Sequence, residues 1–107
     1  LKPSTRQRFV ALSFQYPEPK VEQEILVQET GIEHDVAKKI VILGNKVRNL
    51  TELGLTETVS TRLLVDAAKI IHSGLAKRLA VKVAVMEPLS DEKQILEALY
   101  DLTDLMI

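Results

Sequence analysis

The sequence contains no cysteine, few aromatic residues and little net charge. Without cysteine the chain can form no disulfide, no thiolate nucleophile and no thiolate metal site. Aromatic residues make up 4% of the chain, so its core must be built from Leu, Ile, Val and Ala, a mixture that suits packed helices better than a stacked sheet. A net charge of −1 argues against a surface made for nucleic acid or a membrane, because such surfaces usually carry a basic excess.

Phosphate-binding signatures and membrane-spanning segments are absent as well. The chain has no Gly-x-x-x-x-Gly-Lys-Ser/Thr loop and no Gly-x-Gly-x-x-Gly, so we expect no ATP hydrolysis by this chain alone. No apolar run approaches the roughly 20 residues that a membrane helix needs. The lack of cysteine is compatible with a cytoplasmic protein. Because the chain opens with neither Met nor a signal peptide, we expect it to be part of a longer protein.

What the sequence does contain predicts one extended segment followed by helices. Residues 9–16 alternate apolar with smaller or polar side chains, the pattern of a strand, and Pro17 and Pro19 end it. One strand cannot form a sheet, so its partners must lie elsewhere. We therefore predict an all-α fold, a small bundle of about four to five helices preceded by one extended arm or strand. Residues 1–17 form the arm and residues 18–107 the helical domain.

The helices are expected at apolar repeats of three and four residues. Gly31 ends the first, residues 33–53 form the second, and Ser60 caps a third that Gly74 ends. Residues 75–87 form a fourth, and Ser90 caps the last. The expected inward-facing side chains include Val21, Ile25, Leu79, Val83, Met86 and Leu99.

Most titratable side chains fit ordinary solvated positions. Glu33, His34 and Asp35 are adjacent on a helix start and point in different directions, so they chelate a metal poorly, and no metal site is predicted. His72 suits the dipole at a helix C-terminus. Glu22 and Glu24 are interpreted as part of a solvated, mixed-charge helix face.

Arginines at two places fit phosphate chemistry. Arg62 follows the Ser60 cap in the first turn of a helix, where a cation opposes the dipole unless it serves an anion. Its planar guanidinium suits phosphate, although an ordinary surface arginine explains the same pattern. Arg6 and Arg8 directly precede the predicted strand, a position that is also common for basic residues.

Taken in order, these segments resemble a known family. Residues 1–9 and 12–17 (LKPSTRQRF and LSFQYP) are similar to the end of the core domain in AAA+ ATPases of the CbbQ/NirQ/NorQ group, which is related to MoxR. Gly54-Leu55, residues 60–65 (STRLLV) and residues 87–91 (EPLSD) resemble the C-terminal domain of that group. The similarity extends over essentially the whole chain.

The resemblance implies a role for each arginine. Arg62, with Thr61 beside it, would be the sensor-two residue that reaches from a lid domain to the phosphates of ATP. Arg8, or alternatively Arg6, would be an arginine finger that acts on ATP bound by a neighbouring subunit, a role worth about 10³–10⁵ in rate. ATP and Mg²⁺ would be bound mainly by an upstream core. The partners would be that core, neighbouring subunits of a hexameric ring, and a Rubisco-type or nitric oxide/nitrite reductase client that the ATPase remodels, with no nucleic acid and no membrane.

Two other functions fit the sequence. Residues 47–65 fit a helix-turn-helix whose second helix presents Thr58, Ser60, Thr61 and Arg62 to DNA, although the turn is long and the chain lacks a basic excess. A helical adaptor with no nucleotide role explains the core, but it leaves the lone strand without a purpose.

Overall fold

The computed structural model describes residues 16–50, 55 and 57–107, and it confirms the all-α prediction. These residues include five α-helices: α2 (Pro19–Thr30), α3 (His34–Arg48), α4 (Thr61–His72), α5 (Lys77–Val81) and α6 (Lys93–Met106). A π-helical turn, η2 (Lys82–Met86), and a 3₁₀ turn, η3 (Glu87–Leu89), continue α5. The predicted strand at residues 9–16 lies outside the described residues except for Tyr16. The division into residues 1–17 and 18–107 stays a prediction.

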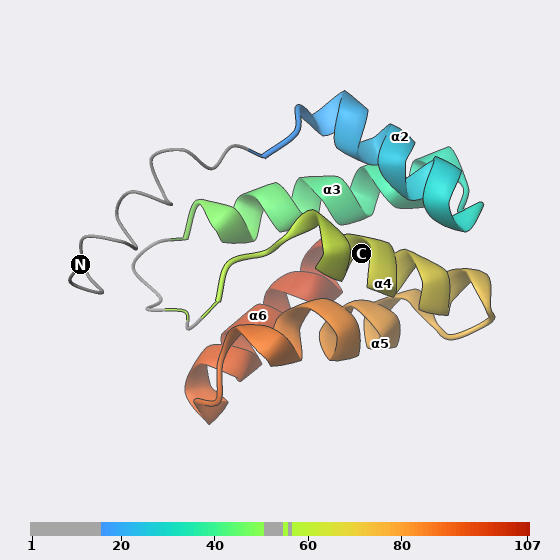
Figure 1. The fold of residues 1–107 in the computed structure, drawn as a ribbon. Coiled ribbons are helices and arrows are strands. Elements are labelled where there is room, and N and C mark those ends of the chain that lie inside the picture. Colours follow the sequence, from blue (N-terminus) through green and yellow to red (C-terminus); the bar gives the residue numbers. More distant parts are fainter. Residues whose placement is uncertain (1–15, 51–54, 56) are drawn as a thin grey trace, which may run out of the picture.

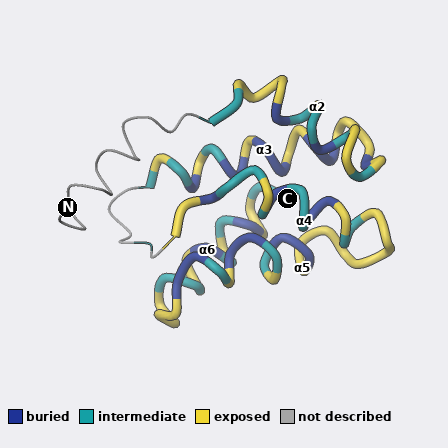
Figure 2. The backbone as a smooth tube through the Cα atoms, in the orientation of Figure 1, coloured by how far each residue is buried: buried dark blue, intermediate teal, exposed yellow. Residues whose placement is uncertain are grey.

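The helices pack in two groups that meet on α4 (Figure 1). Helix α4 contacts α2 and α3 on one side and α5 and η2 on the other, while α6 packs against η2. The buried positions of the helices form one hydrophobic core between the two groups (Figure 2). Large, almost fully buried side chains fill it: Leu26, Ile40, Leu43, Leu64, Met86 and Leu99. Burial of each such side chain stabilises the fold by about 1.5–3 kcal/mol.

Several helix boundaries agree with the sequence. Gly31 has the left-handed φ of 79° at which glycine commonly ends a helix, and its N–H donates to the Val27 carbonyl at 2.8 Å. Ser60 caps α4, since its side chain accepts a hydrogen bond from the Leu63 N–H at 3.3 Å. Gly44 lies inside α3, where a Cβ atom would come within 3.1 Å of a Leu64 methyl group. This glycine therefore permits the close approach of α3 and α4.

Other boundaries differ from the prediction. The helix expected over residues 33–53 ends at Arg48, because the chain tightens there: the Leu50 N–H donates to the Val47 carbonyl at 3.0 Å. The fourth helix begins at Lys77 rather than at residue 75. Ser90 does not cap α6 directly. It accepts from the Glu92 N–H at 3.0 Å, and Glu92 holds the N-cap position.

Three side chains expected in the core are exposed: Val21, Leu79 and Val83. In α2 the buried position next to Val21 is taken by Glu22, which has a partner inside the protein. Along α5 and η2 the buried side chains are Ala80, Val81, Val85 and Met86. Leu79 and Val83, with Leu75, form an outward apolar stripe instead. Among the described residues, every helix is too short or too polar to cross a bilayer.

Candidate functional site

The first turn of α4 presents an unpaired cation. Arg62 is exposed, and none of the described residues gives it a hydrogen bond or an ion pair. This turn contains no acidic residue. A guanidinium beside the positive end of a helix dipole is unfavourable on its own, and a bound anion relieves that repulsion. The geometry therefore leaves Arg62 available to a phosphate or carboxylate from outside the described part of the chain.

A buried ion pair lies directly behind this turn. Arg48, in the last turn of α3, donates to both carboxylate oxygens of Glu22 in α2, at 2.8 and 2.7 Å. The Arg48 and Glu22 side chains are only 5% and 0% exposed. Such two-pronged pairs combine strength with a fixed geometry. The pair joins the end of α3 to the first turns of α2.

Neighbouring groups complete what we call the Arg48 cluster: Arg48, Glu22, Asn45, Thr61 and the Val59 carbonyl. Arg48 also donates to the Asn45 side-chain oxygen and to the Val59 carbonyl, each at 2.8 Å. Thr61 donates its hydroxyl proton to Glu22 at 2.7 Å. Within the described part of the chain, no buried side-chain nitrogen or oxygen lacks a partner. A fully satisfied network of this kind holds its members in one arrangement.

The cluster changes the interpretation of Glu22. The sequence pattern predicts Glu22 and Glu24 on a solvated face, which is wrong for Glu22 because Arg48 pairs with it in the interior. The sequence held a signal for the burial of each residue, although not for their pairing. Glu22 lies one helical turn before the buried Leu26, and Arg48 one turn after the buried Gly44, so both charges follow apolar faces.

The predicted site residues are distributed as follows. Thr61 turns its hydroxyl inward to Glu22, which positions the first turn of α4, and the adjacent Arg62 points outward. Both assignments to ATP stay predictions. Arg6 and Arg8 lie outside the described residues.

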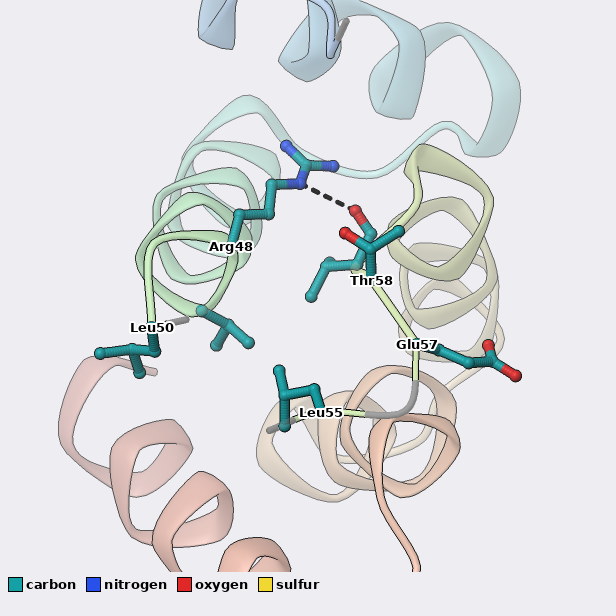
Figure 3. Close-up of a pocket in the computed structure, with 7 residues that line it drawn as sticks. Arg48, Leu50, Leu55, Glu57 and Thr58 are labelled. Carbon is teal, nitrogen blue, oxygen red and sulfur yellow. Dashed lines mark hydrogen bonds between the residues drawn. The ribbon is translucent and has the colours of Figure 1, made fainter. Parts of the chain in front are cut away.

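An open pocket of about 310 Å³ lies beside the cluster (Figure 3). Leu50, Leu55, Glu57 and Thr58 are among its lining residues, and Arg48 borders it with its Nε–H directed to the Val59 carbonyl. The charge of Arg48 is neutralised by Glu22, and Glu57 is itself acidic. The pocket therefore attracts an anion less than the exposed Arg62 does.

The helix-turn-helix interpretation fits this geometry poorly. Residues 49–60 separate α3 from α4, whereas that motif joins its helices by a short turn of about 3–4 residues. Ser60 accepts a hydrogen bond from the backbone of its own helix, and Thr61 bonds to Glu22. The Thr58 hydroxyl forms a hydrogen bond with the Tyr16 hydroxyl. Three of the four side chains assigned to DNA are therefore engaged within the protein.

Histidines also have ordinary surroundings in the described residues. The His72 ring, in the last turn of α4, lies over Gly31, where a Cβ would be 3.4 Å from it. Residues 16–50, 55 and 57–107 contain no group of three or more His, Asp or Glu side chains placed to hold a metal ion.

Comparison with known proteins supports the resemblance found in the sequence. A family model described as CbbQ/NirQ/NorQ C-terminal matches residues 22–106. The chain is 49% identical over 107 residues to the denitrification regulatory protein NirQ of Pseudomonas aeruginosa, covering all of this chain and 41% of that protein. It is 45% identical to protein NorQ of Paracoccus denitrificans, covering 95% of this chain and 38% of that protein.

A third relative is protein CbbQ of Hydrogenophilus thermoluteolus, 43% identical over 92% of this chain and 37% of the relative. The chain thus spans about two fifths of the length of these relatives. With a family model that covers most of the chain and relatives that match nearly all of it, the chain belongs to the CbbQ/NirQ/NorQ C-terminal family.

Proposed function

We propose that this chain is the C-terminal lid domain of a AAA+ ATPase and that Arg62 binds the phosphates of ATP held by the preceding core domain. The observation that carries the proposal is the exposed Arg62 in the first turn of α4, which has no hydrogen bond or ion pair to any described residue, in a member of this family. Its fork of N–H donors suits phosphate oxygens. The Arg48 cluster supports the proposal because it fixes the turn that carries Arg62.

The remaining parts of the active site belong to the longer protein. ATP and Mg²⁺ are bound mainly by the upstream core, and Arg8, or alternatively Arg6, acts as the finger on the ATP of a neighbouring subunit in a cytoplasmic ring. The lid swings relative to the core as nucleotide is bound and released. The proposed client is the nitric oxide or nitrite reductase, or the Rubisco-type enzyme, that the family resemblance implies. One relative is a denitrification regulatory protein.

The test is ATP hydrolysis by the full-length protein that contains this chain. Arg62→Ala should lower the rate at saturating client at least about tenfold, since a charge-assisted hydrogen bond contributes about 1.5–3 kcal/mol. Arg62→Lys should restore part of the rate, because the charge remains and the planar fork is lost.

The matched control is Arg78→Ala, which removes another exposed arginine, in α5. It should leave the rate unchanged, and all three variants should melt like the wild type because both side chains are at the surface. A wild-type rate for Arg62→Ala would reject the sensor assignment.

A helical interaction adaptor is the second candidate. The outward stripe of Leu75, Leu79 and Val83 favours it, because exposed apolar side chains in a row often mark a docking surface. An adaptor predicts a full-length protein whose ATP hydrolysis, if any, does not respond to Arg62→Ala.

A further inference from the structure

One side chain joins the segment that enters the domain to the Arg48 cluster. The Tyr16 ring lies over the Arg48 guanidinium, 3.7 Å from the ring centroid to Cζ. The Tyr16 hydroxyl forms a hydrogen bond with the Thr58 hydroxyl. Tyr16 therefore contacts both the end of α3 and the segment that leads into α4, although it precedes α2 in the chain.

A short series of contacts continues from Tyr16 to Arg62. Arg48 holds the Val59 carbonyl at 2.8 Å and the Glu22 carboxylate at 2.7 Å. Glu22 accepts the hydroxyl of Thr61 at 2.7 Å, and Thr61 is bonded covalently to Arg62. Every link except Tyr16 itself and the Thr58 hydroxyl lies in the part-buried interior, where hydrogen bonds hold their geometry better than at the surface.

The backbone around Tyr16 is stiff for a reason visible in the sequence. Prolines occupy positions 17 and 19, so Tyr16 and Glu18 each precede a proline and favour an extended conformation. Glu18 adopts it, with φ −60° and ψ 150°. Because this backbone is stiff, the position of Tyr16 is fixed relative to the start of α2, which a flexible linker would not achieve.

We infer that Tyr16 is a positioning residue: through its contacts with Arg48 and Thr58 it fixes the turn that carries Arg62 relative to the chain before residue 16. This inference rests on the proposed function, in which the preceding chain is the core that holds ATP. Tyr16 does not touch nucleotide. It determines where Arg62 lies when the lid closes.

The experiment is a double-mutant cycle on ATP hydrolysis by the full-length protein. Tyr16→Leu should lower the rate about two- to thirtyfold, the range of known coupling energies, and raise KM for ATP. In an Arg62→Ala background the same substitution should change nothing further, because the side chain being positioned is gone. Tyr16→Phe keeps the ring over Arg48 and should retain most of the rate.

Two further variants separate positioning from stability. Pro17→Gly leaves the cluster intact and loosens the entry, so it should lower the rate in the wild-type background and not in Arg62→Ala. Tyr100→Leu removes the other tyrosine that lies near a cation, with Lys82 Nζ 5.6 Å from its ring, and should leave the rate unchanged.

Three results would overturn the inference. Wild-type rates for Tyr16→Leu and Pro17→Gly would show that the contact carries no coupling. An equal loss with and without Arg62 would show that Tyr16 acts only on stability. If Arg62→Ala alone has no effect, the proposed function fails first and the inference fails with it, an outcome distinct from the other two.

Discussion

Two trios of the same kinds of group occur among the described residues, in two different environments. In each, a cation pairs with a carboxylate and approaches a tyrosine ring: Arg48 with Glu22 and Tyr16, and Lys82 with Asp104 and Tyr100. The first joins α2, α3 and the entry to α4, with side chains 5% and 0% exposed. The second joins η2 to α6 at the surface, with side chains 24% and 48% exposed.

Burial changes what each trio does for the fold. Water solvates and screens the Lys82–Asp104 pair, so its loss exposes no unsatisfied charge. Arg48 and Glu22 have left water, and each depends on the other and on Asn45, Thr61 and Val59 for its hydrogen bonds. A buried pair contributes little net stability compared with an apolar pair, but removing one partner is severe. The buried trio therefore fixes how α2, α3 and the entry to α4 are arranged. The surface trio adds only a small amount of stability.

The largest effect is expected from breaking the buried pair. Glu22→Gln keeps the shape of the side chain but leaves the Arg48 charge buried without a counter-charge, so it should lower the free energy of unfolding by about 3–5 kcal/mol. Urea unfolding followed by circular dichroism measures this. The double variant Glu22→Leu with Arg48→Met should recover part of the loss, because no charge remains inside. A Glu22→Gln protein as stable as the wild type would mean that the pair is not desolvated.

A much smaller effect is expected at the surface pair. Asp104→Asn should lower the free energy of unfolding by less than about 1 kcal/mol, and the difference should shrink further in high salt. The same urea experiment at low and high salt checks it. A loss as large as that of Glu22→Gln would contradict the contrast between the two trios.

The smallest effect concerns the surface tyrosine. Partial burial raises the pKa of Tyr100, helped by its hydrogen bond to Glu87 and by the negative charge of that carboxylate. A raised pKa favours the protonated phenol in the folded state. Tyr100 therefore contributes stability below the ordinary tyrosine pKa of about 10, and this contribution is lost as pH rises through the folded value.

An absorbance titration of tyrosinate, in a Tyr16→Phe background so that only Tyr100 reports, measures that pKa. Glu87→Gln should return it toward its ordinary value, and Tyr100→Phe should flatten the fall of stability at high pH. Identical titrations with and without the Glu87 carboxylate would refute this assignment.

Local features of the fold were predictable, and long-range ones were not. The Gly31 stop, the Ser60 cap and the apolar stripe of α3 follow from spacing and residue type within one helical turn. The partner of Glu22 lies 26 residues away along the chain, so no local pattern reveals it. The same pairing places Glu22 in the interior and leaves Val21 exposed, so the buried face of α2 is shifted by one residue from Val21 to Glu22.

The predicted inward face of the fourth helix was wrong for a different reason. A period of 3.6 residues predicts that Leu79 and Val83 face inward with Met86, but η2 widens to a π-helical turn before Pro88. Proline cannot donate a hydrogen bond and crowds the preceding turn, which favours a change of helix type there. At the candidate site, helix position and residue type indicated Arg62, whereas the cluster that holds its turn required the three-dimensional structure.

The most direct test of the account is the affinity of the full-length protein for ATP, with Arg62→Ala beside Arg78→Ala. If Arg62 binds the phosphates, Arg62→Ala should weaken ATP binding about tenfold or more, and Arg78→Ala should bind like the wild type. Equal affinity of the wild type and Arg62→Ala would contradict the central claim and favour the interaction adaptor.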